Sequence, residues 1–102
     1  MSNFYFAADR PFLDYAPYRL PGVGGLWRGP APELKPGRYA VALGASQTFG
    51  RFVEQPFPAL LAERIGLPVL NLGIGGAGAF QFRRRDLQPL LDGAKFCIVQ
   101  AM

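Results

Sequence analysis

The stretch Tyr39-Ala-Val-Ala-Leu-Gly-Ala-Ser46-Gln-Thr-Phe-Gly50 decides the fold that we expect for this chain. Its first five residues are apolar, and the glycine-bounded turn that follows places one hydroxyl, that of Ser46, directly after the expected strand. In an open α/β sheet, ligands bind beyond the carboxyl ends of the strands, where the connecting loops begin. Ser46 is therefore the first candidate for a functional residue.

Beyond this stretch, the chain alternates helix-like and strand-like segments with short connections. We expect strands at residues 39–43, 69–72 and 95–102, and helices at residues 58–65 and 80–91. Gly66 and Asp92-Gly93 are placed to end the two helices, and Pro89 weakens the second one. The last strand is almost continuously apolar, which is typical of a strand covered on both faces. The order β-α-β-α-β predicts an α/β fold with a parallel sheet and right-handed crossovers.

The amino-terminal third has a different character. Residues 1–37 contain six of the ten prolines, which prevent a long helix or a central strand. They also contain seven aromatic residues, which argue against a solvated linker. We therefore expect an irregular arm, residues 1–37, that packs against a domain formed by residues 38–102. In the alternative interpretation, Tyr15, Tyr18 and Trp27 line a groove for a carbohydrate or a peptide.

Composition excludes several classes of protein. The formal net charge is only +4, and Arg83-Arg84-Arg85, partly neutralised by Asp86, supplies three of the positive charges, so we expect no nucleic-acid partner. No apolar run is long enough to cross a membrane, and the amino terminus does not resemble an export signal. Cys97 has no partner within the chain and is expected to be a small core residue. We expect a soluble, cytoplasmic protein.

Ser46 and the glycine-rich segment after the second strand form the candidate site. A serine flanked by small residues can present its hydroxyl above the sheet, and its own N–H can face a developing oxyanion. The segment Asn71-Leu-Gly73-Ile-Gly75-Gly76 would bring bare backbone amides beside it. In the simpler interpretation, Ser46 is a turn residue or helix N-cap, and Asn71 ties the two loops together through its amide.

Gly44-Ala45-Ser46, together with Asn71-x-Gly73-x-x-Gly76, resembles the first two sequence blocks of the SGNH (GDSL) hydrolases. The segment 48–63 is also similar to an uncharacterised bacterial family with an SGNH-like start. The resemblance implies the amino-terminal half of a three-layer, flavodoxin-like esterase domain without a metal or cofactor. It implies that Ser46 is the nucleophile, that Gly76 is a second oxyanion donor, and that a small ester or glycan is the substrate. The residues expected to contact the substrate are Gly44, Gln47, Asn71 and Gly73.

The chain departs from the SGNH pattern in three ways. Ala45 stands where these hydrolases usually have aspartate, the chain contains no histidine to act as a base, and the remaining blocks would lie beyond Met102. We therefore expect an incomplete domain that does not turn over an ester by itself, and a second copy or another partner that completes the sheet. Two other functions remain open. One is a non-catalytic binding or assembly module, and Ala45 favours it.

The other open function uses the same glycines to bind a nucleotide. Gly73-Ile-Gly-Gly-Ala-Gly78 matches the G-x-G-x-x-G pattern of dinucleotide-binding folds, in which a pyrophosphate rests on the amino terminus of the following helix. The pattern belongs in the first β-α-β unit, with an acidic residue at the end of the next strand. Here a β-α unit precedes it, and the next strand ends Val-Gln-Ala-Met.

Overall fold

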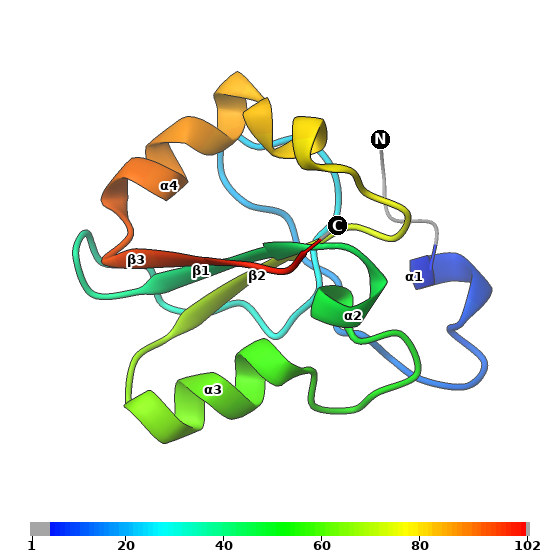
Figure 1. Ribbon diagram of the computed structural model, residues 1–102. Helices are drawn as coiled ribbons and strands as arrows, with labels where there is room; N and C mark the ends of the chain where they lie inside the picture. Colours follow the sequence, from blue (N-terminus) through cyan, green and yellow to red (C-terminus); the bar gives the residue numbers. More distant parts are fainter. Residues whose placement is uncertain (1–4, 102) are drawn as a thin grey trace.

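A three-stranded parallel sheet forms the centre of the molecule (Figure 1). The computed structural model describes residues 5–101. Its elements are α1 (Tyr5–Ala8), β1 (Ala40–Gly44), α2 (Ser46–Phe49), α3 (Phe57–Ile65), β2 (Val69–Gly73), the 3₁₀ turns η1 (Ala79–Arg83) and η2 (Arg85–Leu87), α4 (Gln88–Gly93) and β3 (Phe96–Val99). The predicted α/β fold with a parallel sheet is confirmed.

The strand order is β2-β1-β3, so the strand with Ser46 at its end lies in the middle. β1 pairs with β2 from Ala40↔Val69 to Gly44↔Gly73, which brings the carboxyl ends of the two strands side by side. Successive residues of β1 point to opposite faces of the sheet. Val41 and Leu43 belong to the largest apolar cluster. Ala40 and Ala42 face the other way and pack with residues of α3 and β2.

Helices cover both faces of the sheet (Figure 1). α3 lies on one face, and the small side chains of Ala40 and Ala42 let it approach closely. It ends at Gly66, which adopts φ +66° and donates its N–H to the carbonyl of Ala62, as the sequence predicts. The segment from η1 to α4 lies on the opposite face, where Phe82 and Leu87 join Val41 and Leu43 in the main core.

The predicted helix at residues 80–91 is wrong as a single element. The segment consists of two 3₁₀ turns and the six-residue helix α4. Arg84 interrupts it with an extended backbone, and its guanidinium contacts Asp86 (Nε–Oδ1, 2.9 Å) and the carbonyl of Gly24 (3.1 Å). Pro89 lies in the first turn of α4, where its missing N–H costs no hydrogen bond. The proline therefore starts a helix instead of weakening one.

β3 is an edge strand, and the expectation that both of its faces are covered is wrong. Phe96 and Val99 are 42% and 61% exposed. Cys97 is exposed as well, so it is not the core residue that the sequence indicates. Its partial burial nevertheless raises the pKa of the thiol, which makes the reactive thiolate less abundant at neutral pH. An apolar run in the sequence shows that a strand is able to pack on both faces, but it does not show that other elements cover those faces.

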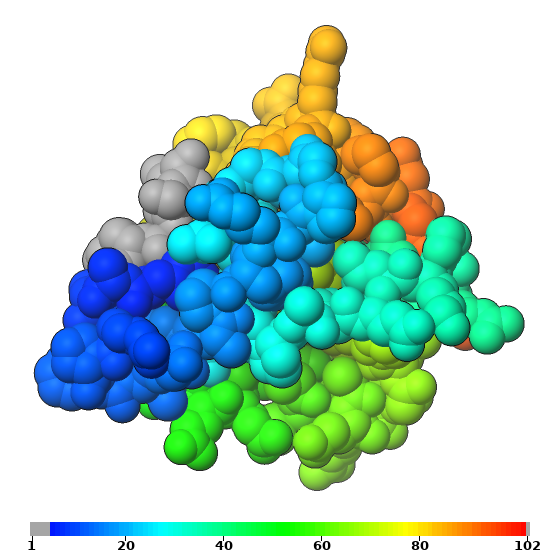
Figure 2. All heavy atoms as spheres, turned by 180° about the vertical axis from the view of Figure 1, so that it is seen from behind, coloured from blue at the N-terminus to red at the C-terminus, as the bar shows by residue number. Residues whose placement is uncertain are grey.

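The arm packs against the sheet domain, as predicted (Figure 2). Leu20, Val23 and Trp27 belong to the same apolar cluster as Val41 and Leu43. Tyr15 and Trp27 are each only 2% exposed, which favours packing over the alternative of an open aromatic groove. Phe4, which also counts among the aromatic residues of the arm, lies outside the described residues. In the part of the chain that the structure describes, no helix has the length and apolar character needed to cross a membrane.

Candidate functional site

Ser46 lies at the carboxyl end of the central strand and is the first residue of α2. The interpretation of Ser46 as a helix N-cap is wrong, because Ala45 occupies that position and no side chain of the cap residue bonds to the helix. The hydroxyl instead forms a hydrogen bond with the phenol of Tyr5, with 2.6 Å between Oγ and Oη. The hydroxyl is therefore held by a residue from the arm.

Gln100, which follows β3, satisfies the amino-terminal end of α2. Its Oε1 accepts hydrogen bonds from the N–H groups of Ala45 and Thr48, both at 3.1 Å, and from Thr48 Oγ1 at 2.7 Å. Its Nε2 donates to the side chain of exposed Gln47. A Cβ at Gly44 would lie 2.1 Å from Thr48 Oγ1 and 2.5 Å from Gln100 Oε1. A glycine is therefore needed at position 44, because the side chains of Thr48 and Gln100 occupy the space beside it. Gly44 does not line an open substrate site.

Asn71 ties the two candidate loops together, as the sequence predicts. It is 7% exposed. Its Nδ2 donates to the carbonyl of Thr48, and its Oδ1 accepts the N–H of Gly73, both at 2.8 Å. Ile74 N–H donates to the carbonyl of Gly44 at 3.0 Å. The side chain of Asn71 and the N–H of Gly73 are thus used inside the protein, and the expectation that they contact a substrate is not supported.

The glycines after β2 have different roles. A Cβ at Gly73 would lie 2.3 Å from the backbone nitrogen of Phe49, so this glycine allows α2 to pack on β2. A Cβ at Gly75 would lie 2.5 Å from the ring of Tyr5. Gly76 is exposed and has φ +75°, and a Cβ placed there would have no heavy atom within 4 Å. Of these glycines, Gly76 is the one with open space beside it, as an oxyanion donor requires.

An ion pair between the buried carboxylate of Asp9 and the partly exposed Arg51 joins the arm to the loop after α2. Asp9, only 2% exposed, accepts hydrogen bonds from Arg51 Nε at 2.9 Å and Arg51 Nη2 at 3.1 Å, and from the Tyr15 hydroxyl at 2.6 Å. The bonds from Arg51 hold the pKa of Asp9 below its usual value, although burial opposes the shift. The Arg51 guanidinium also lies 4.2 Å from the centre of the Tyr5 ring.

Arg28 holds the loop after α2 in place. Its side chain is 3% exposed, and it donates to four backbone carbonyls at 2.6–3.2 Å, those of Phe49, Gly50, Val53 and Glu54. It also lies 4.5 Å from the centre of the Tyr15 ring. Burial lowers the pKa of the guanidinium, but an arginine remains charged at neutral pH. Arg28 therefore stabilises the backbone conformation of the loop that follows α2, close to Ser46 in the chain.

Sequence reasoning did not find Tyr5, Asp9, Arg28 or Gln100. Tyr5, Asp9 and Arg28 lie in the proline-rich arm, where no periodic pattern indicates which side chains turn inward. Gln100 offers a weak signal, because it is the first polar residue after the apolar run 96–99 and so lies at the carboxyl edge of the sheet.

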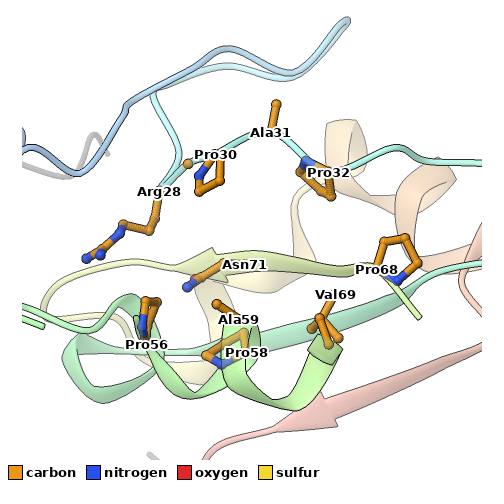
Figure 3. A pocket seen from close by; sticks show the side chains of 12 residues that line it. Arg28, Pro30, Ala31, Pro32, Pro56, Pro58, Ala59, Pro68, Val69 and Asn71 are labelled. Atoms are coloured by element: carbon orange, nitrogen blue, oxygen red, sulfur yellow. The ribbon is translucent and has the colours of Figure 1, made fainter. Parts of the chain in front are cut away.

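Two hollows lie near these residues. A shallow depression of about 310 Å³ is lined by Ser46, Gln47, Gly50, Arg51 and Val53. A second pocket of about 220 Å³ lies between the arm, α3 and β2, and its lining includes five prolines (Figure 3). Asn71 and Arg28 reach its edge, but their hydrogen bonds go to backbone groups around α2. The depression therefore has a hydroxyl residue, Ser46, in its lining. The second pocket offers a mainly apolar surface.

The geometry does not favour the dinucleotide alternative. Gly73 belongs to β2 itself, its N–H is bonded to Asn71, and the segment after Gly78 is the five-residue 3₁₀ turn η1 instead of an α-helix. A pyrophosphate would thus lack the helix amino terminus on which it normally rests. Within residues 5–101, no group of three or more His, Cys, Asp or Glu side chains is placed to hold a metal ion.

Comparison with known proteins gives one match. The family model described as "Domain of unknown function (DUF6473)" matches residues 3–102 and so includes nearly all of the arm as well as the sheet. No curated protein and no solved structure matches the chain.

Proposed function

We propose that this chain, which belongs to the DUF6473 family of domains of unknown function, carries the nucleophile of a serine ester hydrolase or acyltransferase related to the SGNH hydrolases. The observation that carries the proposal is the juxtaposition of two loops. Ser46 follows the central strand, and the segment from Ile74 to Gly76 follows its neighbour, with Gly44 and Gly73 paired at the ends of the two strands. The strand order β2-β1-β3 supports it, because flavodoxin-like sheets begin with that order.

In the proposed reaction, Ser46 Oγ attacks the carbonyl carbon of a small ester or an acylated glycan. The N–H groups of Ser46 and Gly76 stabilise the oxyanion, and the ester C–O bond then breaks so that the alcohol leaves with the proton taken from the serine. The acyl group is afterwards transferred from Ser46 to water or to another hydroxyl, which regenerates the serine hydroxyl. The chain contains no histidine, so the base that takes the proton from Ser46 comes from outside this sequence. The proposed location is the cytoplasm, and the exposed edge of β3 is where a partner or a second copy would extend the sheet.

A fluorophosphonate probe tests this proposal, since it forms a covalent bond with an activated serine. The probe is applied to the gene product as the cell makes it. The chain contains two serines, Ser2 and Ser46, so Ser2→Ala is a matched control for Ser46→Ala. We expect labelling that Ser46→Ala removes and Ser2→Ala preserves. Labelling that survives Ser46→Ala contradicts the proposal, and so does an absence of labelling in both the unmodified protein and Tyr5→Ala, in which the phenol no longer occupies the serine hydroxyl.

A second candidate is a non-catalytic binding module with the same fold. Ala45 favours it, because the residue lacks the carboxylate that braces the nucleophile loop in SGNH hydrolases. The hydrogen bond from Tyr5 also favours it, because it occupies the serine hydroxyl. For a module of this kind, the fluorophosphonate experiment gives no labelling of Ser46.

A further inference from the structure

The ring of Tyr5 occupies the space that a substrate of the Ser46 site would need. Its hydroxyl contacts Ser46 Oγ, and its ring lies against Gly75, so closely that a Cβ there would be 2.5 Å from the ring. Tyr5 is only 6% exposed. It therefore stands between the serine and the loop that leads to Gly76, where a carbonyl group would have to enter. The depression beside Ser46 has none of residues 73–78 in its lining, so it does not bypass Tyr5.

The described contacts between the segment that carries Tyr5 and the rest of the molecule are made mainly by side chains, including those of Phe6 and Leu13, which pack against Tyr15 and Phe49. We call residues 5–14 the strap. Between described residues, the backbone hydrogen bonds of the strap join its own members, with Asp9 N–H bonded to the carbonyl of Tyr5 and with Phe12 and Leu13 N–H bonded to the carbonyl of Asp9. Tyr5 packs in a small aromatic cluster with Tyr15 and Phe49, separate from the cluster that holds the sheet. Most of the other strap residues are exposed.

The buried carboxylate of Asp9 locks the strap in this position. Arg51 binds it through two nitrogens and also covers the Tyr5 ring, so one side chain of the loop after α2 holds both strap residues. The chain after the strap is anchored independently. Tyr15 is 2% exposed and accepts the N–H of Phe52 through its hydroxyl, and Trp27 lies in the main core. Loss of the Asp9–Arg51 contact would therefore weaken the hold on the strap without removing Tyr15 from the core, although the Tyr15–Asp9 hydrogen bond and the packing of Phe6 on Phe49 would remain.

We propose that the strap is a removable cover that keeps Ser46 inaccessible while Asp9 is paired with Arg51, and that its departure opens the space between Ser46 and Gly75. The inference rests on the proposed function, in which that space receives the substrate. Displacement of the strap, by a substrate or by a partner that pairs with Arg51 in place of Asp9, then sets when the serine can react.

The test measures access to position 46 with a reaction that needs no catalytic machinery. Cys97 is the only cysteine of the chain, so Ser46→Cys combined with Cys97→Ala leaves a single thiol at the site. Its rate of reaction with N-ethylmaleimide is measured alone, with Asp9→Asn, and with Asp14→Asn as the matched control. Asp14 is exposed in its pair with Arg10, so its loss leaves the lock intact.

We expect Asp9→Asn to increase the rate about tenfold, which corresponds to about 1.4 kcal/mol of lost closing free energy, and Asp14→Asn to leave it unchanged. Equal rates in all three proteins overturn the proposal. Should circular dichroism show that Asp9→Asn does not fold, Tyr5→Ala removes the covering ring directly and is held to the same tenfold criterion. A faster thiol reaction, combined with no fluorophosphonate labelling of Ser46 when Asp9→Asn or Tyr5→Ala is made in the otherwise unmodified protein, supports the cover and refutes the proposed function, so the two failures are distinguishable.

Discussion

Replacement of Asn71 by leucine isolates the two hydrogen bonds that tie β2 to α2. Leucine has nearly the same shape, so the substitution leaves little cavity, but it removes the partners of the Thr48 carbonyl and the Gly73 N–H, both bound at 2.8 Å. A buried polar group that loses its partner costs about 1–3 kcal/mol. For two such groups, offset in part by the added apolar burial, we expect a loss of about 2–5 kcal/mol in the free energy of unfolding.

Urea denaturation followed by the fluorescence of Trp27, which is buried, measures this loss. Gln55→Leu is the control, because Gln55 is an exposed amide whose side chain reaches only Glu63, and it should change stability by less than about 0.5 kcal/mol. Asn71→Asp keeps the acceptor for Gly73 and should regain stability as the pH falls, because the protonated carboxyl can again donate to Thr48. A loss below about 0.5 kcal/mol in Asn71→Leu would refute the assignment of Asn71 as the tie between the loops.

Three further substitutions test other parts of the site. Gly73→Ala should lower the free energy of unfolding, measured by urea denaturation, more than Gly76→Ala does. A Cβ at Gly73 would lie 2.3 Å from the backbone nitrogen of Phe49, whereas Gly76 has open space and only the αL penalty of about 1–2 kcal/mol. Equal losses would contradict the close approach of α2 to β2. Gln100→Ala should speed the hydrogen exchange of the Thr48 amide, measured by NMR, because Gln100 Oε1 accepts a hydrogen bond from that N–H. Unchanged exchange would contradict the role of Gln100 at the start of α2. Asp9 has a lowered pKa, so its contribution to stability is present above about pH 4 and is lost as the pH falls through the folded value. The difference in unfolding free energy between the wild type and Asp9→Asn should therefore shrink on acidification, and a difference that stays constant down to pH 2 would contradict the ion pair.

The sequence was sufficient to predict a structural feature where the interactions that form the feature lie within a few residues of one another. The apolar run before Gly44 and the capping position of Gly66 predict β1 and the end of α3, because strand burial and the αL conformation act within a few residues. The role of Asn71 was also predicted correctly, since it lies on the strand next to the one that leads into the Ser46 segment. In each of these cases, the partner lies within the same turn, on an adjacent strand, or in the short helix that directly follows the adjacent strand.

Long-range partners account for the rest. Tyr5 lies 41 residues before Ser46, and Gln100 lies 52 residues after Thr48, and no spacing rule connects positions so far apart in an irregular arm and a strand end. The covering of β3 depends on what packs against it and not on its own composition. The helix at residues 80–91 failed for a third reason: Arg84 gains its contacts with Asp86 and Gly24 only in the fold, and these override local helix propensity.

The grip of Arg28 on the loop after α2 has an evolutionary consequence. All four of its acceptors are main-chain oxygens, so the clamp does not depend on which side chains the loop carries. Positions such as Val53 and Glu54 can therefore diversify among relatives while the loop keeps its shape. Such an arrangement separates the path of the loop from its surface chemistry, so single substitutions at Val53 can alter the lining of the Ser46 depression while the backbone stays in place.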